Sequence, residues 1–206
     1  MVTYLIIALN CIVSIYGFSN RSFFSKYLFN PYSIQRNKKE WCHIFTHAFL
    51  HADYMHLLFN MFTFYSIGLP LEQEVFPAYF GNHAEYYFVL LYVGGIMASA
   101  FPAFEKNKNN FGYTSVGASG AVCAVIFSYI LILPTSGMMM LFLPFSIPAA
   151  LFGGLFLLVS WYLSKRGGGR VAHDAHFWGG VFGFVFTILL KFSLLPAFFE
   201  QIKSLF

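Results

Sequence analysis

Six long apolar runs constrain what this chain can fold into. Only 10% of its 206 residues are charged and 58% are hydrophobic, whereas a soluble domain carries about 25% charge. Too little polar surface remains to cover a water-soluble globule, so a bilayer must surround most of the chain. The runs span residues 2–18, 54–70, 84–104, 119–133, 139–163 and 174–195. We predict an all-α integral membrane protein, a single domain over residues 1–206 with six transmembrane helices and no extramembrane domain.

Charge, the first apolar run and the cysteines limit which partners and which processing the chain is expected to have. The net charge is +4, but the basic residues are scattered through the connections, so no nucleic-acid partner is expected. The first run lacks a basic flank and a cleavage motif, so it is interpreted as a retained span. The three cysteines show no C-x-x-C spacing, and Cys11 and Cys123 lie in apolar runs. We expect the cysteines to be small buried hydrophobes.

The fourth run is short for a span. About 15 residues reach about 22 Å, less than the hydrocarbon core, so the run must begin below the membrane surface. The preceding segment, NKNNFGYTSVGA, then enters the membrane as irregular backbone, which survives there only inside protein or beside a water-filled cavity. The sequence thus predicts a recessed, hydrated position for Ser119.

The connections carry further expectations. Pro144 and Pro148 fall in the fifth run and are predicted to bend or loosen its helix. PTSG at 134–137 is predicted to be a tight turn and SKRGGGR at 164–170 a flexible basic loop. The first connection, residues 19–53, is either an amphipathic element in the membrane interface or a plain extramembrane loop.

Small residues flank Ser119 in the stretch GASG. One such serine is weak evidence of chemistry, because small residues are common at membrane helix contacts. Gly120, Ala124 and Ser128 form a stripe at i, i+4 and i+8, which predicts a close neighbouring helix.

The sixth run offers that neighbour. Gly179 and Gly183 form a close-approach motif, and His176 lies one turn above it on the same face. An imidazole within reach of a hydroxyl is what a serine nucleophile needs. Polar packing between two helices is the alternative.

The segment WCHIFTHAFLHADYMHLLFNM concentrates histidines. His47 and His51 are spaced i, i+4, as are His56 and Asn60. Histidines at this spacing can chelate a metal, but no carboxylate or cysteine completes an obvious set. The second hypothesis is an oxyanion site, with donors from His56, Asn60 and the Ser119 backbone N–H.

Taken together, these motifs resemble the rhomboid intramembrane serine proteases. The shared features are the six-span core, H-x-x-x-N in span two, G-x-S-G at span four and A-H-x-x-G-x-x-x-G in span six. The resemblance covers residues 1–195 and implies no metal or organic cofactor. It implies a dyad in which Ser119 attacks a peptide carbonyl and His176 transfers the proton.

The resemblance also assigns other residues. His56, Asn60 and the Ser119 N–H match the family's oxyanion donors, and Gly117, Gly120, Gly179 and Gly183 are expected to pack helices. Thr46, His47, His51 and Glu72 are expected to be structural or to retain water.

Two positions depart from the family pattern. The family's Trp-Arg pair is Trp41-Cys42 here, so loop anchoring by that arginine is missing. The tyrosine often found four residues after the serine, whose ring stacks under the histidine, is Cys123. No motif carboxylate orients His176, and Asp174 is not expected to act in catalysis.

The resemblance implies transmembrane protein substrates and a location in the plasma (inner) membrane, with the site open to the non-cytoplasmic side. The positive-inside tendency argues for the reverse orientation, because 10 of the 12 Lys and Arg residues fall in the first, third and fifth connections. Two other functions stay open: a rhomboid-like protein that binds membrane clients without cleaving them, and a small transporter or metal-binding membrane protein.

Overall fold

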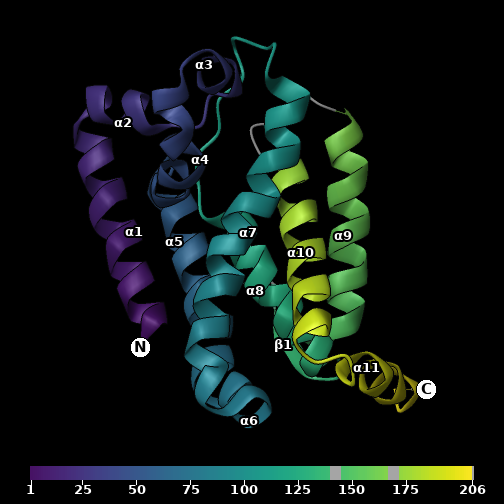
Figure 1. The fold of residues 1–206 in the computed structure, drawn as a ribbon. Coiled ribbons are helices and arrows are strands. Elements are labelled where there is room, and N and C mark those ends of the chain that lie inside the picture. The colour runs from purple at the N-terminus through teal and green to yellow at the C-terminus, as the bar shows by residue number, and fades with distance from the viewer. Residues whose placement is uncertain (140–144, 167–171, 206) are drawn as a thin grey trace.

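The computed structural model describes residues 1–139, 145–166 and 172–205. The described part is helical apart from one small hairpin (Figure 1). The longer α-helices are α1 (Val2–Ser19), α5 (Tyr54–Thr63), α7 (Ala84–Asn107), α8 (Ser119–Ile132), α9 (Ala149–Arg166), α10 (His173–Leu190) and α11 (Leu194–Lys203). The all-α class predicted from the sequence is confirmed.

Helix α8 lies at the centre of the bundle, between α7 and α10 (Figure 1). It is apolar on all sides, and 12 of its 14 residues are buried. A helix that is hydrophobic all round is expected to be enclosed by other helices. By contrast, only four residues of α1 and three of α9 are buried, and these two helices lie at opposite edges of the bundle in Figure 1.

The first connection folds into short helices. These are α2 (Arg21–Tyr27), α3 (Pro31–Arg36), η1 (Lys38–Cys42), α4 (His43–Thr46) and η2 (His47–Phe49). Asparagine side chains cap the first three: Asn20, Asn30 and Asn37 each accept a backbone N–H from the helix that follows. The connection is therefore an ordered, capped structure rather than a plain loop.

The second run continues well beyond residue 70 as helix. After α5 come two π-helical segments, η3 (Phe64–Gly68) and η4 (Leu71–Val75), then α6 (Phe76–Phe80) and η5 (Gly81–His83), which leads into α7. The segment from Tyr54 to Asn107 is nearly continuous helix that reverses direction at Gly81, where φ is 54°, so that the rings of Phe88 and Tyr92 in α7 pack on Phe64 (Figure 1). The two separate helical runs predicted from the sequence are therefore present.

The fifth run was predicted wrongly at its start. Residues Gly137–Met139 (β1) and Ser146–Pro148 (β2) pair as an antiparallel hairpin, and helix α9 begins only at Ala149. Pro148 therefore precedes the helix and cannot bend it, and Pro144 lies outside the described residues. The turn predicted at 134–137 is present directly before β1.

The basic loop predicted at 164–170 is wrong for its first three residues. Ser164, Lys165 and Arg166 are still part of α9, and residues 167–170 lie outside the described part of the chain. Residues 108–118 are irregular, as predicted.

Fewer helices pass a test of length and hydropathy for membrane spans than the six predicted from the sequence. Within the described residues, two helices are long and apolar enough to cross a membrane, Val2–Ser19 and Tyr54–Asn107. Helices α10 and α11 make a third candidate if this pair, bent by 114°, counts as one span, and α8 is a shorter apolar helix. These apolar helices are consistent with a membrane protein.

Candidate active site

Helices α8 and α10 touch through their small residues. A Cβ built on Gly179 would collide with the carbonyl oxygen of Gly120, and one on Gly183 with the carbonyl oxygen of Ala124. One turn further along, the Thr187 hydroxyl donates to the Ser128 hydroxyl at 2.7 Å. The stripe predicted on the fourth run therefore faces the glycines of the sixth. The two helix backbones are in direct contact there, with no room for a side chain between them.

This contact brings Ser119 and His176 together. Ser119 is the first residue of α8 and His176 lies in the first turn of α10. The Oγ of Ser119 is 2.9 Å from Nε2 of His176, which is within hydrogen-bond distance. Both side chains are partly exposed, so a substrate can reach them.

Gly117 plays a different part from the predicted one. It lies before α8 in irregular backbone, with φ of 123°, which side chains rarely adopt. Its N–H donates to the carbonyl of His47 at 3.0 Å, and a Cβ at Gly117 would lie 2.9 Å from Nε2 of His56. Gly117 thus turns the chain against an imidazole rather than packing two helices.

His56 and Asn60 lie one turn apart on α5 beside Ser119. The Ala52 N–H donates to Nδ1 of His56 at 3.4 Å, which leaves Nε2 as the protonated nitrogen. Asn60 is buried, and its side-chain amide donates to the His56 carbonyl at 3.0 Å. The amide has a second N–H to offer. His56, Asn60 and Ser119 line the same cavity, and the Ser119 N–H has no partner within α8.

A cavity of about 930 Å³ opens onto the pair. Helix α5 contributes His56, Phe59, Asn60 and Thr63, and α9 contributes Phe152 and Phe156. The extended segment 113–116 forms another wall, and is tied to the first connection by a bridge in which Phe29 and Ser115 exchange N–H···O bonds of 3.0 Å. The cavity is large enough for an extended peptide segment.

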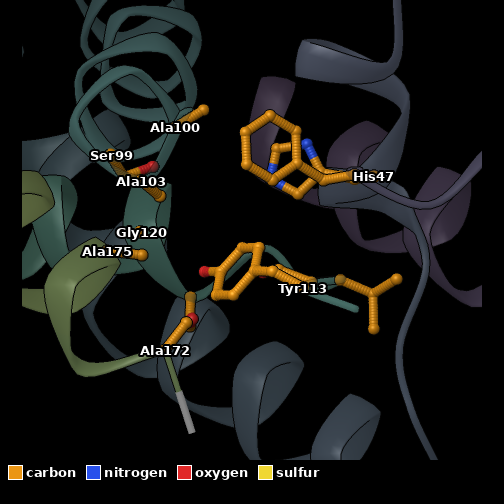
Figure 2. A pocket seen from close by; sticks show the side chains of 13 residues that line it. His47, Ser99, Ala100, Ala103, Tyr113, Gly120, Ala172 and Ala175 are labelled. Carbon is orange, nitrogen blue, oxygen red and sulfur yellow. The ribbon is translucent and has the colours of Figure 1, made fainter. Parts of the chain in front are cut away.

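Ser119 also lines a second, much smaller pocket of about 20 Å³, which has Tyr113 and His47 among its other lining residues (Figure 2). Figure 2 shows Tyr113 crossing it, with the hydroxyl pointing toward Gly120 and Ala175. Nδ1 of His47 donates to the His43 carbonyl at 2.9 Å, so Nε2 is an acceptor. Burial lowers the pKa of His47 to about 4, which keeps the ring neutral. Such a volume with polar walls suits one water molecule.

The other supporting residues fall into two groups. Thr46 donates to the Tyr27 carbonyl at 3.2 Å, and His51 shares a 2.9 Å hydrogen bond with Ser14 of α1. Burial lowers the pKa of His51 to about 3, and its ring lies 4.9 Å, centroid to centroid, from that of His56. These contacts join α1 and the first connection to α5.

Glu72 holds the beginning of α1. Its carboxylate accepts the Thr3 N–H at 2.8 Å and lies 3.1 Å from the terminal amine of Met1. A carboxylate at a helix N-terminus is a stabilising arrangement.

The three cysteines differ in exposure, and two of them occupy the positions that depart from the family pattern. Cys42 is exposed and Cys123 is buried, and Cys11 is partly buried; all three are free thiols. The expectation of buried cysteines is therefore wrong for Cys42. Asp174 forms a 2.7 Å ion pair with Lys106 of α7. Among the described residues, no cluster of histidine, cysteine or carboxylate side chains could hold a metal ion.

A family model described as the Rhomboid domain matches residues 38–192. The match covers more than half of the chain and includes every motif around Ser119 and His176. The chain belongs to the rhomboid family. The comparison with curated proteins found no match. Family membership and the apolar helices together make this rhomboid a membrane protein.

Sequence reasoning missed three residues around the rhomboid site. Ser99 packs against Gly120 and donates to the Ile96 carbonyl at 2.9 Å, and Tyr113 lines the smaller pocket. The third, Phe156, lies against His176. The only signal for Ser99 was a small residue in an apolar run, and no pattern singled out the other two.

Proposed function

We propose that this rhomboid is an intramembrane serine endopeptidase that cleaves transmembrane segments through a Ser119–His176 dyad. The single observation that carries the proposal is the 2.9 Å contact between Ser119 Oγ and His176 Nε2, at the edge of a cavity that can admit a peptide. A nucleophile hydrogen-bonded to a base is the arrangement that hydroxyl activation requires.

The geometry supports a two-step acyl transfer. Ser119 Oγ attacks the scissile carbonyl carbon while Nε2 of His176 takes the hydroxyl proton. The same nitrogen then gives that proton to the leaving amine as the peptide bond breaks, leaving an acyl ester on Ser119. In the second step His176 takes a proton from water, the resulting hydroxide attacks the ester, and the proton returns to Ser119.

Charge develops on the carbonyl oxygen in both steps. Nε2–H of His56, the free amide N–H of Asn60 and the backbone N–H of Ser119 are available as donors on this side of the site. Fixed donors aimed at a developing oxyanion stabilise it without reorganising. The smaller pocket, with neutral His47 and the Tyr113 hydroxyl, is suited to hold the water for deacylation.

Asn60→Ala is expected to lower the turnover number by about 10-fold to 1,000-fold, as loss of one oxyanion donor does in other enzymes. Binding of the substrate should change much less, because the donor acts on charge that is absent in the ground state. Steady-state cleavage of a model transmembrane peptide in detergent measures both quantities. An unchanged turnover number would reject the role of Asn60.

The proposal includes how the protein lies in the bilayer and which substrates reach its site. We further propose six membrane spans, a short α8 whose start lies below the membrane surface, and a hydrated recess around Ser119. Substrates are then membrane proteins whose helices unwind locally near that surface. We place this rhomboid in the plasma (inner) membrane, with the site open to the non-cytoplasmic side.

Exposed Cys42 tests this orientation directly. It belongs to the first connection, which family topology puts on the same side as the serine. A membrane-impermeant maleimide is expected to label Cys42 in intact cells, and Cys42→Ser should abolish that labelling. Labelling that requires permeabilised cells would reverse the orientation, in agreement with the positive-inside tendency, and would leave the dyad unaffected.

A serine-directed fluorophosphonate tests the proposed activity itself. Wild type is expected to be labelled and Ser119→Ala is not, because only a hydroxyl activated by a neighbouring base reacts readily. Equal labelling of the two proteins would end the enzyme hypothesis. It would favour a rhomboid that binds membrane clients without cleaving them.

A further inference from the structure

His176 is supported by an aromatic ring from an unexpected helix. The ring of Phe156 on α9 lies 5.9 Å from the His176 ring, centroid to centroid, with 30° between their planes. This separation is within the range of packed aromatic pairs. Cys123 of α8, at the position where the family pattern often has a tyrosine, lines the same cavity as Phe156 and His176.

Phe156 is itself held by two other rings. It stacks on Phe152, one turn earlier in α9, at 5.7 Å, and lies 6.1 Å from Phe127 of α8. Phe127 fills the space next to Gly180 of α10 and Gly153 of α9, because a Cβ at either glycine would press on its ring. The position of Phe156 relative to His176 is therefore set where three helices meet.

We propose that Phe156 is a positioning residue for His176, replacing from α9 the ring that position 123 of α8 does not supply. The inference rests on the proposed dyad. A planar ring beside the imidazole limits its rotation and keeps Nε2 directed at Ser119 Oγ. Misplacement of a reacting group by about 1 Å can cost about 100-fold in rate, so loss of this ring should be felt in the chemical step.

The proposal couples the dyad to α9. Phe152 and Phe156 of α9 line the same cavity as His56, Asn60 and Thr63 of α5. A displacement of α9 away from α5 would widen the cavity and, at the same time, withdraw the ring from His176. The dyad would then be fully assembled only when α9 is docked on α8 and α10.

The first experiment compares ring deletions along α9. Phe156→Ala is expected to slow fluorophosphonate labelling of Ser119 by about 10-fold to 100-fold, whereas Phe156→Tyr, which keeps a ring, should label at close to the wild-type rate. Tyr162→Ala is the control within α9, because it removes a ring that is exposed and lies outside the cavity lining. Equal slowing by Tyr162→Ala and Phe156→Ala would indicate general loosening of α9 and overturn the proposal.

Rescue separates positioning from packing. A ring restored from α8 should take the vacated space, so Cys123→Tyr combined with Phe156→Ala is expected to recover most of the lost labelling rate. Cys123→Tyr alone should bring no gain, because Phe156 already occupies that side of the imidazole. A double variant no faster than Phe156→Ala would contradict the proposal.

A spectroscopic readout keeps the inference distinct from the proposed activity. The Hε1 resonance of His176, assigned with His176→Ala in histidine-labelled protein, should shift on Phe156→Ala through loss of the ring current and stay in place on Tyr162→Ala. If the fluorophosphonate does not label the wild type, the proposed protease activity is wrong, but the shift of the His176 resonance can still be measured. If the wild type is labelled and Phe156→Ala causes no shift, only the positioning role of Phe156 is wrong.

Discussion

His176→Ala is expected to lower the turnover number for peptide cleavage by about 10⁴-fold or more, because a nucleophile and its base act as a unit and loss of either removes nearly the whole effect. Asp174, two residues earlier in α10, is paired with Lys106 at 2.7 Å and is not placed to act instead. Steady-state cleavage of a model transmembrane peptide in detergent, combined with the fluorophosphonate labelling rate, measures the loss.

His173→Ala is the matched control for this prediction. His173 lies on the same helix, and its ring is 6.0 Å from that of His176, centroid to centroid. The His173 ring is edge-on to that of His176, and no hydrogen bond joins it to Ser119 among the described residues, so its removal should lower turnover far less than removal of His176. A His176→Ala variant that cleaves as fast as His173→Ala would show that His176 is not the base.

The contact between the dyad helices was predictable because it depends on periodicity. Small residues at i, i+4 and i+8 define one helix face whatever surrounds them, and the glycines of α10 define a second. Two such faces in an apolar chain have few other places to pack. The adjacent Ser119 and His176 then come together with little further information.

The hairpin before α9 was not predictable by the same reasoning. Residues 137–148 are almost continuously apolar, and a short apolar run fits a buried strand and a helix segment equally well. Pro148 ends β2 and the helix begins at the next residue, a boundary that the hydrophobic pattern could not supply. Proline is tolerated in such an edge strand.

The surroundings of the dyad depend on tertiary contacts that leave no local pattern. Phe156 is one of 28 phenylalanines, and nothing in α9 distinguishes it before α9 docks on α10. Tyr113 belongs to an irregular segment, where periodicity has no meaning. The role of Gly117 was mistaken because a glycine next to a small-residue stripe suggests helix packing, whereas its positive φ becomes visible only in the backbone.

Gly183→Leu is expected to prevent α8 and α10 from docking, and even Gly183→Ala should lower the free energy of unfolding by about 3 kcal/mol or more. The added Cβ meets the Ala124 carbonyl oxygen and backbone, which cannot move aside as a side chain can. Far-UV circular dichroism during SDS titration of the detergent-solubilised protein measures the loss. Because Ser119 and His176 depend on this contact, labelling of Ser119 should fall in parallel.

The same substitution at Gly154 of α9 is expected to have the opposite effect on the free energy of unfolding. A Cβ at Gly154 meets nothing within 4 Å, and alanine is the better helix former by about 1 kcal/mol, so Gly154→Ala should leave stability unchanged or slightly raised. The same substitution in two helical glycines then separates helix propensity from close approach. If Gly183→Ala were as stable as Gly154→Ala, the two helices would not need backbone contact, and the dyad would have to be assembled in some other way.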